Sequence, residues 1–387
     1  MKMNKKTLII VAAVVVVLAV VLVVLLAGGK KDQTPVTPEN PAPVEKEFKL
    51  GMGIVVSLDS SASYNVAESK AGVAQFDATV ATVVLDAQGK IVVCRLDAVQ
   101  NKAELNNNGT YTVKNLLTKM ELGDDYNMAK YGQNMDWNGD KIVKEWYDQA
   151  KAFENYVIGM TADEVAAMPT KVVEGSGYII SAEDALLNAG CTIQITDFKE
   201  AVVKACKDEQ GTSFKTNGTI TLGVAANSFV EIDEVKNDKT TIATADKNGA
   251  MHIYSDFAAS AVVGGKIVAS LNDAIQPSIT FDVNGNIVAK SFKATKRELM
   301  EDYNMAKYGQ SMDWNGDKVV KEWYLQSAAF SAYVVGMTKA QVEAMPTKVV
   351  EGSGYIISAE DALLNAGCTI QITDIKAVVA ESITNAR

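Results

Sequence analysis

Two short segments of this 387-residue chain combine residue types that could hold a phosphate group. The segment 188–192 reads Asn-Ala-Gly-Cys-Thr, and the segment 365–369 repeats it letter for letter. A glycine lets the backbone approach a ligand closely, and neighbouring N–H groups can donate to phosphate oxygens. The turn that ends a helix has a similar composition, so a purely structural role is the alternative interpretation.

A predicted helix carries a second candidate group, the aromatic residues Trp146, Tyr147, Phe153 and Tyr156. Aromatic side chains at helical spacing usually pack in a core. The alternative role is for Trp146 or Tyr147 to form the wall of a site for a flat ligand.

Several kinds of site are disfavoured by composition and spacing. One histidine is too few for bis-His haem or a histidine-rich metal site, and a Ser-His-Asp triad is not visible. The four cysteines show no CxxC spacing, which argues against zinc ribbons and iron–sulfur clusters. In the segment 136–140 (Asp-Trp-Asn-Gly-Asp) glycine is fourth, whereas an EF-hand calcium loop requires it sixth. A net charge of −10 predicts no nucleic-acid partner.

An internal duplication decides the organisation of the elements that position these residues. The segment 167–197 is identical to 344–374, an offset of 177, and weaker matches extend the repeat upstream. We therefore predict one domain present twice in tandem, copy 1 at 48–208 and copy 2 at 209–387. Each copy has an ordinary domain size.

Each copy is predicted to be α+β, an antiparallel sheet with helices packed on it. In copy 1 the runs 76–85 and 90–96 flank the turn 86–89 and predict a hairpin. Helical spacing follows from residue 142 to 157, and a Thr161–Glu164 capping box begins a further short helix. The apolar run 191–195 is predicted to be a short strand.

The N-terminus predicts a membrane anchor. Residues 8–27 are 20 consecutive apolar residues, enough for a helix to cross a hydrocarbon core of ~30 Å. Lysines precede them, which predicts a cytoplasmic tail at 1–7, a transmembrane helix at 8–28 and an extracytoplasmic body. A proline-rich linker follows at 29–47. Cleavage of the apolar segment as a signal peptide is the alternative.

Cys94 and Cys206 both lie in copy 1 and have no counterparts in copy 2. Outside the cytoplasm such a pair could form a disulfide private to copy 1. Cys191 and Cys368 lie in different copies and are not expected to pair.

The order of these motifs resembles the extracytoplasmic FMN-binding domain family of bacterial envelope flavoproteins, in two tandem copies. The resemblance rests on the anchor, the linker, the hairpin turn at 89–92 and the closing Ala-Gly-Cys-Thr. It also rests on the internal segments 119–122 (Lys-Met-Glu-Leu), 125–128 (Asp-Tyr-Asn-Met) and 144–149 (Lys-Glu-Trp-Tyr-Asp-Gln). The family closes with Asp-x-x-Ser-Gly-Ala-Thr, whereas here Ala189 replaces the Ser and Cys191 replaces the Ala.

The resemblance implies an electron-transfer flavoprotein with FMN in both copies, rather than an enzyme with its own acid or base. A flavin transferase would attach FMN through its phosphate to the final Thr of each motif, and a membrane donor and an external acceptor, both unknown, would exchange electrons with it. The alternative is a non-redox surface binding or adhesion protein. The implied phosphate-site residues are Thr192, Gly190, Cys191 and Asn188, with Thr369, Gly367, Cys368 and Asn365 in copy 2. The implied ring-wall residues are Tyr126 and Met128, with Tyr303 and Met305 in copy 2.

Overall fold

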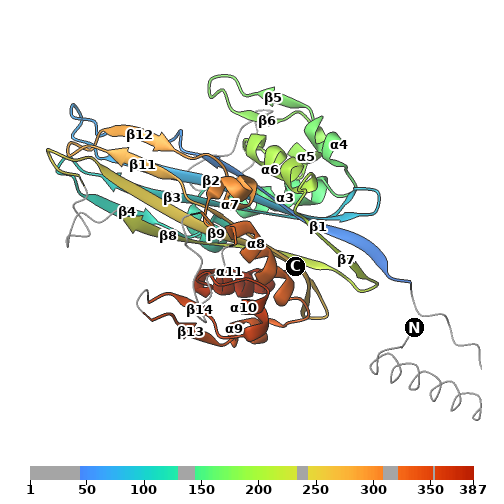
Figure 1. Cartoon of the computed structure of the whole chain (residues 1–387). Helices are drawn as coiled ribbons and strands as arrows, with labels where there is room; N and C mark the ends of the chain where they lie inside the picture. Colours follow the sequence, from blue (N-terminus) through green and yellow to red (C-terminus); the bar gives the residue numbers. More distant parts are fainter. Residues whose placement is uncertain (1–43, 130–143, 233–242, 308–320, 352–353) are drawn as a thin grey trace, which may run out of the picture. The chain divides into compact units, whose positions relative to one another are not determined.

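The structure is a computed structural model that describes residues 44–129, 144–232, 243–307, 321–351 and 354–387 (Figure 1). Residues Glu45–Arg387 form one compact unit. The predicted cytoplasmic tail, transmembrane helix and most of the linker lie outside the described residues. Within the described ranges, no helix is both long enough and apolar enough to cross a membrane.

The first sheet has five antiparallel strands in the order β4-β3-β2-β1-β7. The strands are β1 (Lys46–Ser57), β2 (Gly72–Asp86), β3 (Ile91–Leu105), β4 (Tyr111–Asn115) and β7 (Thr212–Thr216). The predicted hairpin is confirmed as β2 and β3. Its turn closes because Asp86 Oδ1 accepts from the N–H groups of Gln88 and Lys90, and Gly89 takes the positive φ of +73°.

The second sheet repeats the pairing of β1, β2 and β3 with one break. Its strands are β8 (Thr221–Ile232), β9 (Gly249–Val263), β10 (Lys266–Ile275), β11 (Ser278–Phe281) and β12 (Ile287–Ser291). The long strand β9 pairs with β8 on one side and with both β10 and β11 on the other. The equivalent of the continuous β3 is interrupted at Pro277, which has no N–H for the ladder.

Strand β7 joins the two copies, because it belongs to the predicted copy 2 by sequence but pairs with β1 of the first sheet. Thr212–Thr216 runs antiparallel to the segment 46–50 of β1. The rings of Phe48 and Phe214 stack 5.7 Å apart across this pair. The chain from one copy therefore completes the sheet of the other.

The sheets and helices form four layers, with one helical layer above the two sheets and one below in Figure 1. Between the sheets lies an apolar core that includes Ile54, Val80, Val224 and Phe257. The opposite face of each sheet is also apolar and is covered by its own copy's helices. Strand β2 is consequently buried along almost its whole length, since alternate side chains enter different cores.

The helices recur in the same order in both copies. Copy 1 contains α2 (Lys119–Leu122), the 3₁₀ turn η1 (Gly123–Tyr126), α3 (Trp146–Tyr156), α4 (Ala162–Ala166), α5 (Asp184–Asn188) and α6 (Thr196–Cys206). Copy 2 contains α7 (Lys296–Leu299), η2 (Met300–Tyr303), α8 (Trp323–Tyr333), α9 (Lys339–Glu343), α10 (Asp361–Asn365) and α11 (Thr373–Thr384). Short hairpins also recur, β5 (Thr170–Val172) with β6 (Ile179–Ser181), and β13 (Thr347–Val349) with β14 (Ile356–Ser358).

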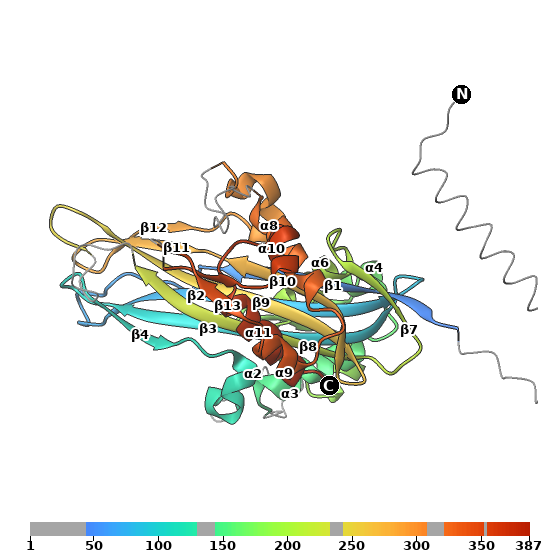
Figure 2. The ribbon, with the colours of Figure 1, turned by 60° about the horizontal axis from the view of Figure 1, so that its bottom comes forward.

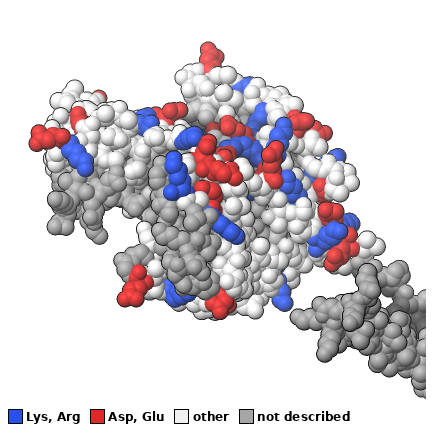
Figure 3. Space-filling view, viewed as in Figure 1, with Lys and Arg blue, Asp and Glu red and all other residues white. Residues whose placement is uncertain are grey.

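Figure 2 turns the molecule by 60° and shows α11 lying along β8 and β9. On the face in Figure 3, acidic and basic side chains lie interspersed around the middle of the molecule. The α+β class with antiparallel sheets and packed helices is thus as predicted. The Thr161–Glu164 capping box is also confirmed, and Thr338 with Gln341 forms its counterpart in copy 2.

Two local expectations differ from the structure. Residues 191–195 do not form a strand, because the N–H groups of Thr192 and Ile193 bond to a side chain instead of a neighbouring strand. Cys94 and Cys206 are free thiols rather than a disulfide. Both belong to the apolar core under the copy 1 helices, and burial raises the pKa of each thiol.

Candidate functional site

A cavity of about 730 Å³ opens in copy 1 between the outer face of the first sheet and the helices. This volume lies within the range of small-molecule sites. Strands β1, β2 and β3 contribute one side, and η1, α3 and the start of α6 contribute the other. The lining residues are Ser57, Asp59, Ser60, Asp77, Thr79, Ala98, Val99, Gln100, Lys119, Tyr126, Met128, Trp146, Tyr178, Ile193, Gln194, Asp197 and Phe198.

The predicted ring-wall residues of copy 1, Tyr126 and Met128, both line this cavity. Trp146 joins them, and the edge of its indole packs on Phe198 with the ring centroids 5.6 Å apart. The ammonium of Lys119 lies 4.9 Å from the Tyr126 ring centroid and 5.4 Å from that of Trp146. The lining therefore includes four aromatic side chains, those of Tyr126, Trp146, Tyr178 and Phe198, and one thioether.

Local hydrogen bonds hold these walls in place. Thr118 and Glu121 form a capping box that starts α2 and so positions Lys119. The carboxylate of Glu145 accepts from the backbone N–H groups of Met128 and Ala129, at 2.9 and 3.2 Å. These bonds tie the segment before the undescribed residues 130–143 to the start of α3.

Carboxylates dominate the charge of the cavity. Asp59, Asp77 and Asp197 line it, and Lys119 is the only cationic side chain among the lining residues. Burial raises the pKa of Asp197, and the nearby Glu200 raises it further, while Lys119 lowers it. A ligand with a free phosphate would meet repulsion from these groups unless its phosphate lay beside Lys119.

Beneath the cavity, the carboxyl of Asp97 links β3 to α2. Its Oδ1 accepts from the N–H groups of Ala98 and Met120, at 2.7 and 3.2 Å. Burial raises the pKa of Asp97 to about 7. Asp273 makes the equivalent link in copy 2, and burial raises its pKa to about 6.

The predicted phosphate-site threonine of copy 1 is buried and its backbone is already bonded. Thr192 is 0% exposed. The side-chain oxygen of Gln149 accepts from the N–H groups of Thr192 and Ile193, at 2.9 and 3.1 Å, and lies 3.4 Å from the Thr192 hydroxyl. The Gln149 amide nitrogen in turn donates to the Lys144 carbonyl at 3.0 Å. A neutral amide oxygen thus occupies the donors that a phosphate would use.

The other predicted residues of this motif have structural surroundings. Gly190 has a φ of +99° and packs under Lys144, whose ammonium donates to the Ala189 carbonyl at 2.9 Å. Cys191 is buried, which raises its pKa to about 12. Asn188 is exposed at the end of α5.

Copy 2 repeats the motif almost unchanged. Gln326 accepts from the N–H groups of Thr369 and Ile370, at 2.8 and 3.1 Å, and Thr369 is also 0% exposed. Gly367 has a φ of +97°. Cys368 is buried with a pKa of about 12, and Asn365 is exposed at the end of α10.

In copy 2, the predicted ring-wall residue Tyr303 has a nearby aromatic side chain, Tyr254, that copy 1 does not have. Tyr254 stands on β9 where copy 1 has Asp77, and its cross-strand neighbour is Phe229 where copy 1 has Ser57. The rings of Phe229 and Tyr254 stack 5.1 Å apart with an interplanar angle of 2°. Lys296 lies over three rings, at 5.6 Å from Tyr254, 5.1 Å from Tyr303 and 5.3 Å from Trp323.

A hydrogen-bonded chain fixes the Tyr254 side chain in copy 2. Gln276 bonds to the Tyr254 hydroxyl through its amide nitrogen, and its oxygen accepts from the Tyr303 hydroxyl at 3.1 Å. Met305 is buried, with its N–H donating to Glu322 at 2.9 Å. The wall residues of the two copies are therefore equivalent, but their surroundings are not.

Of the predicted ring-wall residues, Tyr126 and Met128 line a described cavity, whereas the glutamine that holds the motif was not among the predicted site residues. Gln149 and Gln326 recur at the 177-residue offset inside Trp-Tyr-x-Gln, and this recurrence was a visible signal. Comparison with protein-family models, curated proteins and solved structures finds no match to this chain.

Proposed function

We propose that copy 1 binds a flavin non-covalently by its ring and that the chain is an electron-transfer flavoprotein. The observation that carries this proposal is the convergence of Tyr126, Met128 and Trp146 on one cavity beside Ile193 and Gln194. The resemblance implies Tyr126 and Met128 for the ring, Trp146 is the aromatic residue that helical spacing suggested as a wall, and Ile193 and Gln194 directly follow Thr192. In the same proposal, the apolar segment 8–28 holds the body on the outer side of a membrane.

The residues of the cavity fit the ring portion of FMN. Aromatic and thioether side chains suit a flat conjugated ligand, and Gln100 and Gln194 offer both donors and acceptors for its polar edge. When bound, the flavin would supply the redox chemistry. The protein's own residues would orient the ring and limit its contact with water.

The same residues fit the phosphate portion less well. The N–H groups of Thr192 and Ile193 are bonded to Gln149, and three carboxylates line the cavity. Covalent attachment through Thr192 and Thr369 is a separate proposal, because it requires Gln149 and Gln326 to release those segments. Coexpression with a flavin transferase and intact mass tests it. Two added FMN masses, one lost in Thr192→Ala and one in Thr369→Ala, are the result it requires.

A second candidate function is non-redox binding of a hydroxyl-rich or cationic ligand. The observation that favours it is the excess of carboxylates, Asp59, Asp77 and Asp197, beside the aromatic rings. Such a site would serve a surface binding or adhesion protein without any flavin.

Flavin titration of the purified full-length chain separates these functions. We expect one site per chain, seen as quenching of flavin fluorescence. Riboflavin should bind at least as tightly as FMN, because the phosphate adds repulsion from the carboxylates. Absence of quenching by either flavin rejects the flavin proposal and leaves the non-redox function.

A further inference from the structure

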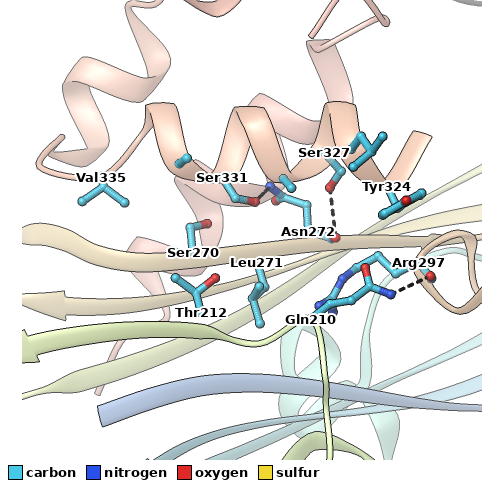
Figure 4. A pocket seen from close by; sticks show the side chains of 13 residues that line it. Gln210, Thr212, Ser270, Leu271, Asn272, Arg297, Tyr324, Ser327, Ser331 and Val335 are labelled. Carbon is cyan, nitrogen blue, oxygen red and sulfur yellow. Dashed lines mark hydrogen bonds between the residues drawn. The ribbon is translucent and has the colours of Figure 1, made fainter. Parts of the chain in front are cut away.

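We infer a second, independent ligand site in copy 2, which takes a small neutral amphiphile with an amide or hydroxyl head group. The site is a cavity of about 290 Å³ between α8, strand β10 and the start of β7 (Figure 4). Its lining is mostly apolar with a few polar side chains, as is common in ligand sites. The lining residues are Gln210, Thr212, Ser270, Leu271, Asn272, Arg297, Tyr324, Leu325, Ser327, Ala328, Ser331, Ala332 and Val335.

Two buried polar atoms of this lining have no hydrogen-bond partner within the described part of the chain. They are the hydroxyl of Ser270, 1% exposed, and the side-chain oxygen of Asn272, 2% exposed. Leaving such a group unsatisfied in a protein interior costs about 1–3 kcal/mol. Two of them on one strand, facing one cavity, therefore indicate a partner that enters the cavity.

The neighbouring bonds define what the partner must offer. The amide nitrogen of Asn272 donates to the Ser331 hydroxyl at 2.7 Å, so the Asn272 oxygen is oriented by that bond and can only accept. The Ser327 hydroxyl donates to the backbone carbonyl oxygen of Asn272 at 3.1 Å, so it does not satisfy the side-chain oxygen. The hydroxyl of Ser270 can donate as well as accept. A matching head group needs an N–H or O–H donor and an acceptor, which a carboxamide or an alcohol provides.

The charge of the lining selects a neutral ligand. Arg297 is the only ionised side chain among the lining residues, and its guanidinium is paired with both carboxylate oxygens of Asp208, at 3.2 and 3.1 Å. Both side chains are less than 10% exposed. A carboxylate ligand would compete with Asp208, and an ammonium ligand would meet Arg297.

The equivalent positions of copy 1 lack these free groups. Cys94 stands at the position of Ser270, Leu96 at that of Asn272, Ala150 at that of Ser327 and Glu154 at that of Ser331. There the Glu154 carboxylate accepts from the Leu96 N–H at 2.9 Å and pairs with Arg387. In copy 1 an ion pair occupies the space between the helix and the strand. In copy 2 the residues at these positions are two serines and an asparagine beside Ser270.

The rim of the site is apolar, which predicts that the ligand carries an apolar body beside its head group. Leu325 on α8 and Val335, two residues after the end of α8, are 43% and 46% exposed, and Ala328 and Ala332 are exposed between them. The equivalent residues of copy 1 are Asp148, Ile158, Lys151 and Asn155, of which only Ile158 is apolar. A short alkyl chain attached to the head group would cover this rim.

Hexanamide is the probe for the test, with hexanoate as a charged analogue of the same length. Saturation-transfer NMR on the full-length chain should show binding of hexanamide. Hexanoate should bind at least about tenfold more weakly, because it lacks a donor for Asn272 and has no free cation to pair with. Failure of hexanamide to bind at millimolar concentration overturns the inference and leaves ordered water as the partner of Ser270 and Asn272. Equal or tighter binding of hexanoate overturns the neutral assignment.

Substitution by the residues of copy 1 identifies the site. The double variant Ser270→Cys with Asn272→Leu should weaken hexanamide binding at least about tenfold, while Ser57→Ala in the cavity of copy 1 should leave it unchanged. The double variant should also unfold at a temperature no lower than the parent, which shows that it folds. Unchanged hexanamide affinity in the folded double variant contradicts the site.

Discussion

The two copies carry the same 31-residue closing segment but offer different cavities. In copy 1, Ser57 and Asp77 leave open space beside Tyr126 and Trp146. In copy 2, Phe229 and Tyr254 stack at the equivalent cross-strand pair, and Tyr254 bonds to Gln276. The repeated motif therefore does not decide whether a copy can take a flat ligand, because the diverged strands before it do.

The side chains that the covering helix places over its sheet also differ between the two copies. Helix α3 buries Glu154, whose carboxylate oxygens lie beside Arg387, whereas α8 places the small Ser327 and Ser331 over Asn272. The cavity of copy 1 lies beside η1 and the start of α3, whereas that of copy 2 lies between α8 and β10. The two copies therefore carry cavities at different places on the same scaffold.

Exchange of one cavity residue should have the largest effect. Asp77→Tyr introduces the residue of copy 2 and should remove flavin binding, a loss on the order of 100-fold, because the ring space is filled. Fluorescence titration measures it. Retained flavin affinity in folded Asp77→Tyr would show that the cavity is not the flavin site.

The reciprocal exchange in copy 2 should open a second place for the flavin ring. Phe229→Ser with Tyr254→Asp recreates the pair of copy 1 and should raise the flavin stoichiometry from one to two per chain. A stoichiometry that stays at one, in a variant with an unchanged circular dichroism spectrum, would show that other differences also exclude the ligand from copy 2.

The buried glutamines should matter equally in both copies, since their contacts are nearly the same. Gln149→Ala leaves the N–H groups of Thr192 and Ile193 without an acceptor and should lower the free energy of unfolding by about 2–4 kcal/mol. Gln326→Ala is the matched variant and should cost a similar amount. Urea denaturation measures both, and a difference between them greater than about 1 kcal/mol would contradict the equivalence.

Asp256 should give copy 2 a pH dependence that Thr79 cannot give at the equivalent position of copy 1. Burial raises the pKa of Asp256 to about 7, helped by Asp374 and Asp273 and opposed by Lys296. The folded state therefore binds a proton that the unfolded state, with a carboxyl pKa of ~3.9, has released. Stability from this group is complete below about pH 4 and is lost as the pH rises to about 7.

Asp256→Asn should remove this loss and stabilise the chain at pH 8 by about 3–4 kcal/mol relative to its effect at pH 4, since one pKa unit corresponds to about 1.36 kcal/mol. Urea denaturation at the two pH values tests it. Asp97 and Asp273 should still make stability fall with rising pH in this variant, because the variant keeps the equivalent carboxyl in both copies. If the free energy of unfolding differed between pH 4 and pH 8 by the same amount in the variant and the parent, Asp256 would not be buried as a neutral acid.

The smallest expected effect comes from the lysine beside the rings. Lys119→Ala should weaken FMN binding by about threefold, because Lys119 is the one cation among the lining residues that could lie beside the phosphate, and an exposed ion pair is worth ~0.2–1 kcal/mol. Riboflavin should lose less, since it has no phosphate for Lys119 to balance. Lys296→Ala is the matched change in copy 2 and should leave flavin affinity unchanged. A loss of flavin affinity in Lys296→Ala would place the ligand in copy 2, against the proposal.

Local sequence was sufficient for several features of both the fold and the site. The duplication, the hairpin of β2 and β3, the capping boxes and the turn at Gly190 all depend on residues close together in the chain. The pairing of Tyr126 with Met128 at the cavity wall also came from one short motif. These features could be predicted because their hydrogen bonds and side-chain contacts span few residues.

Only the tertiary structure decided which groups meet across long separations. Three such features are the pairing of β7 with β1, the packing of the two sheets on each other and the stacking of Tyr254 on Phe229. The burial of Thr192 depends on Gln149, which lies 43 residues earlier. The sequence determined that the motif exists twice. Packing determined that its donors are already bonded, because an N–H group buried in a core must find a partner wherever the fold provides one.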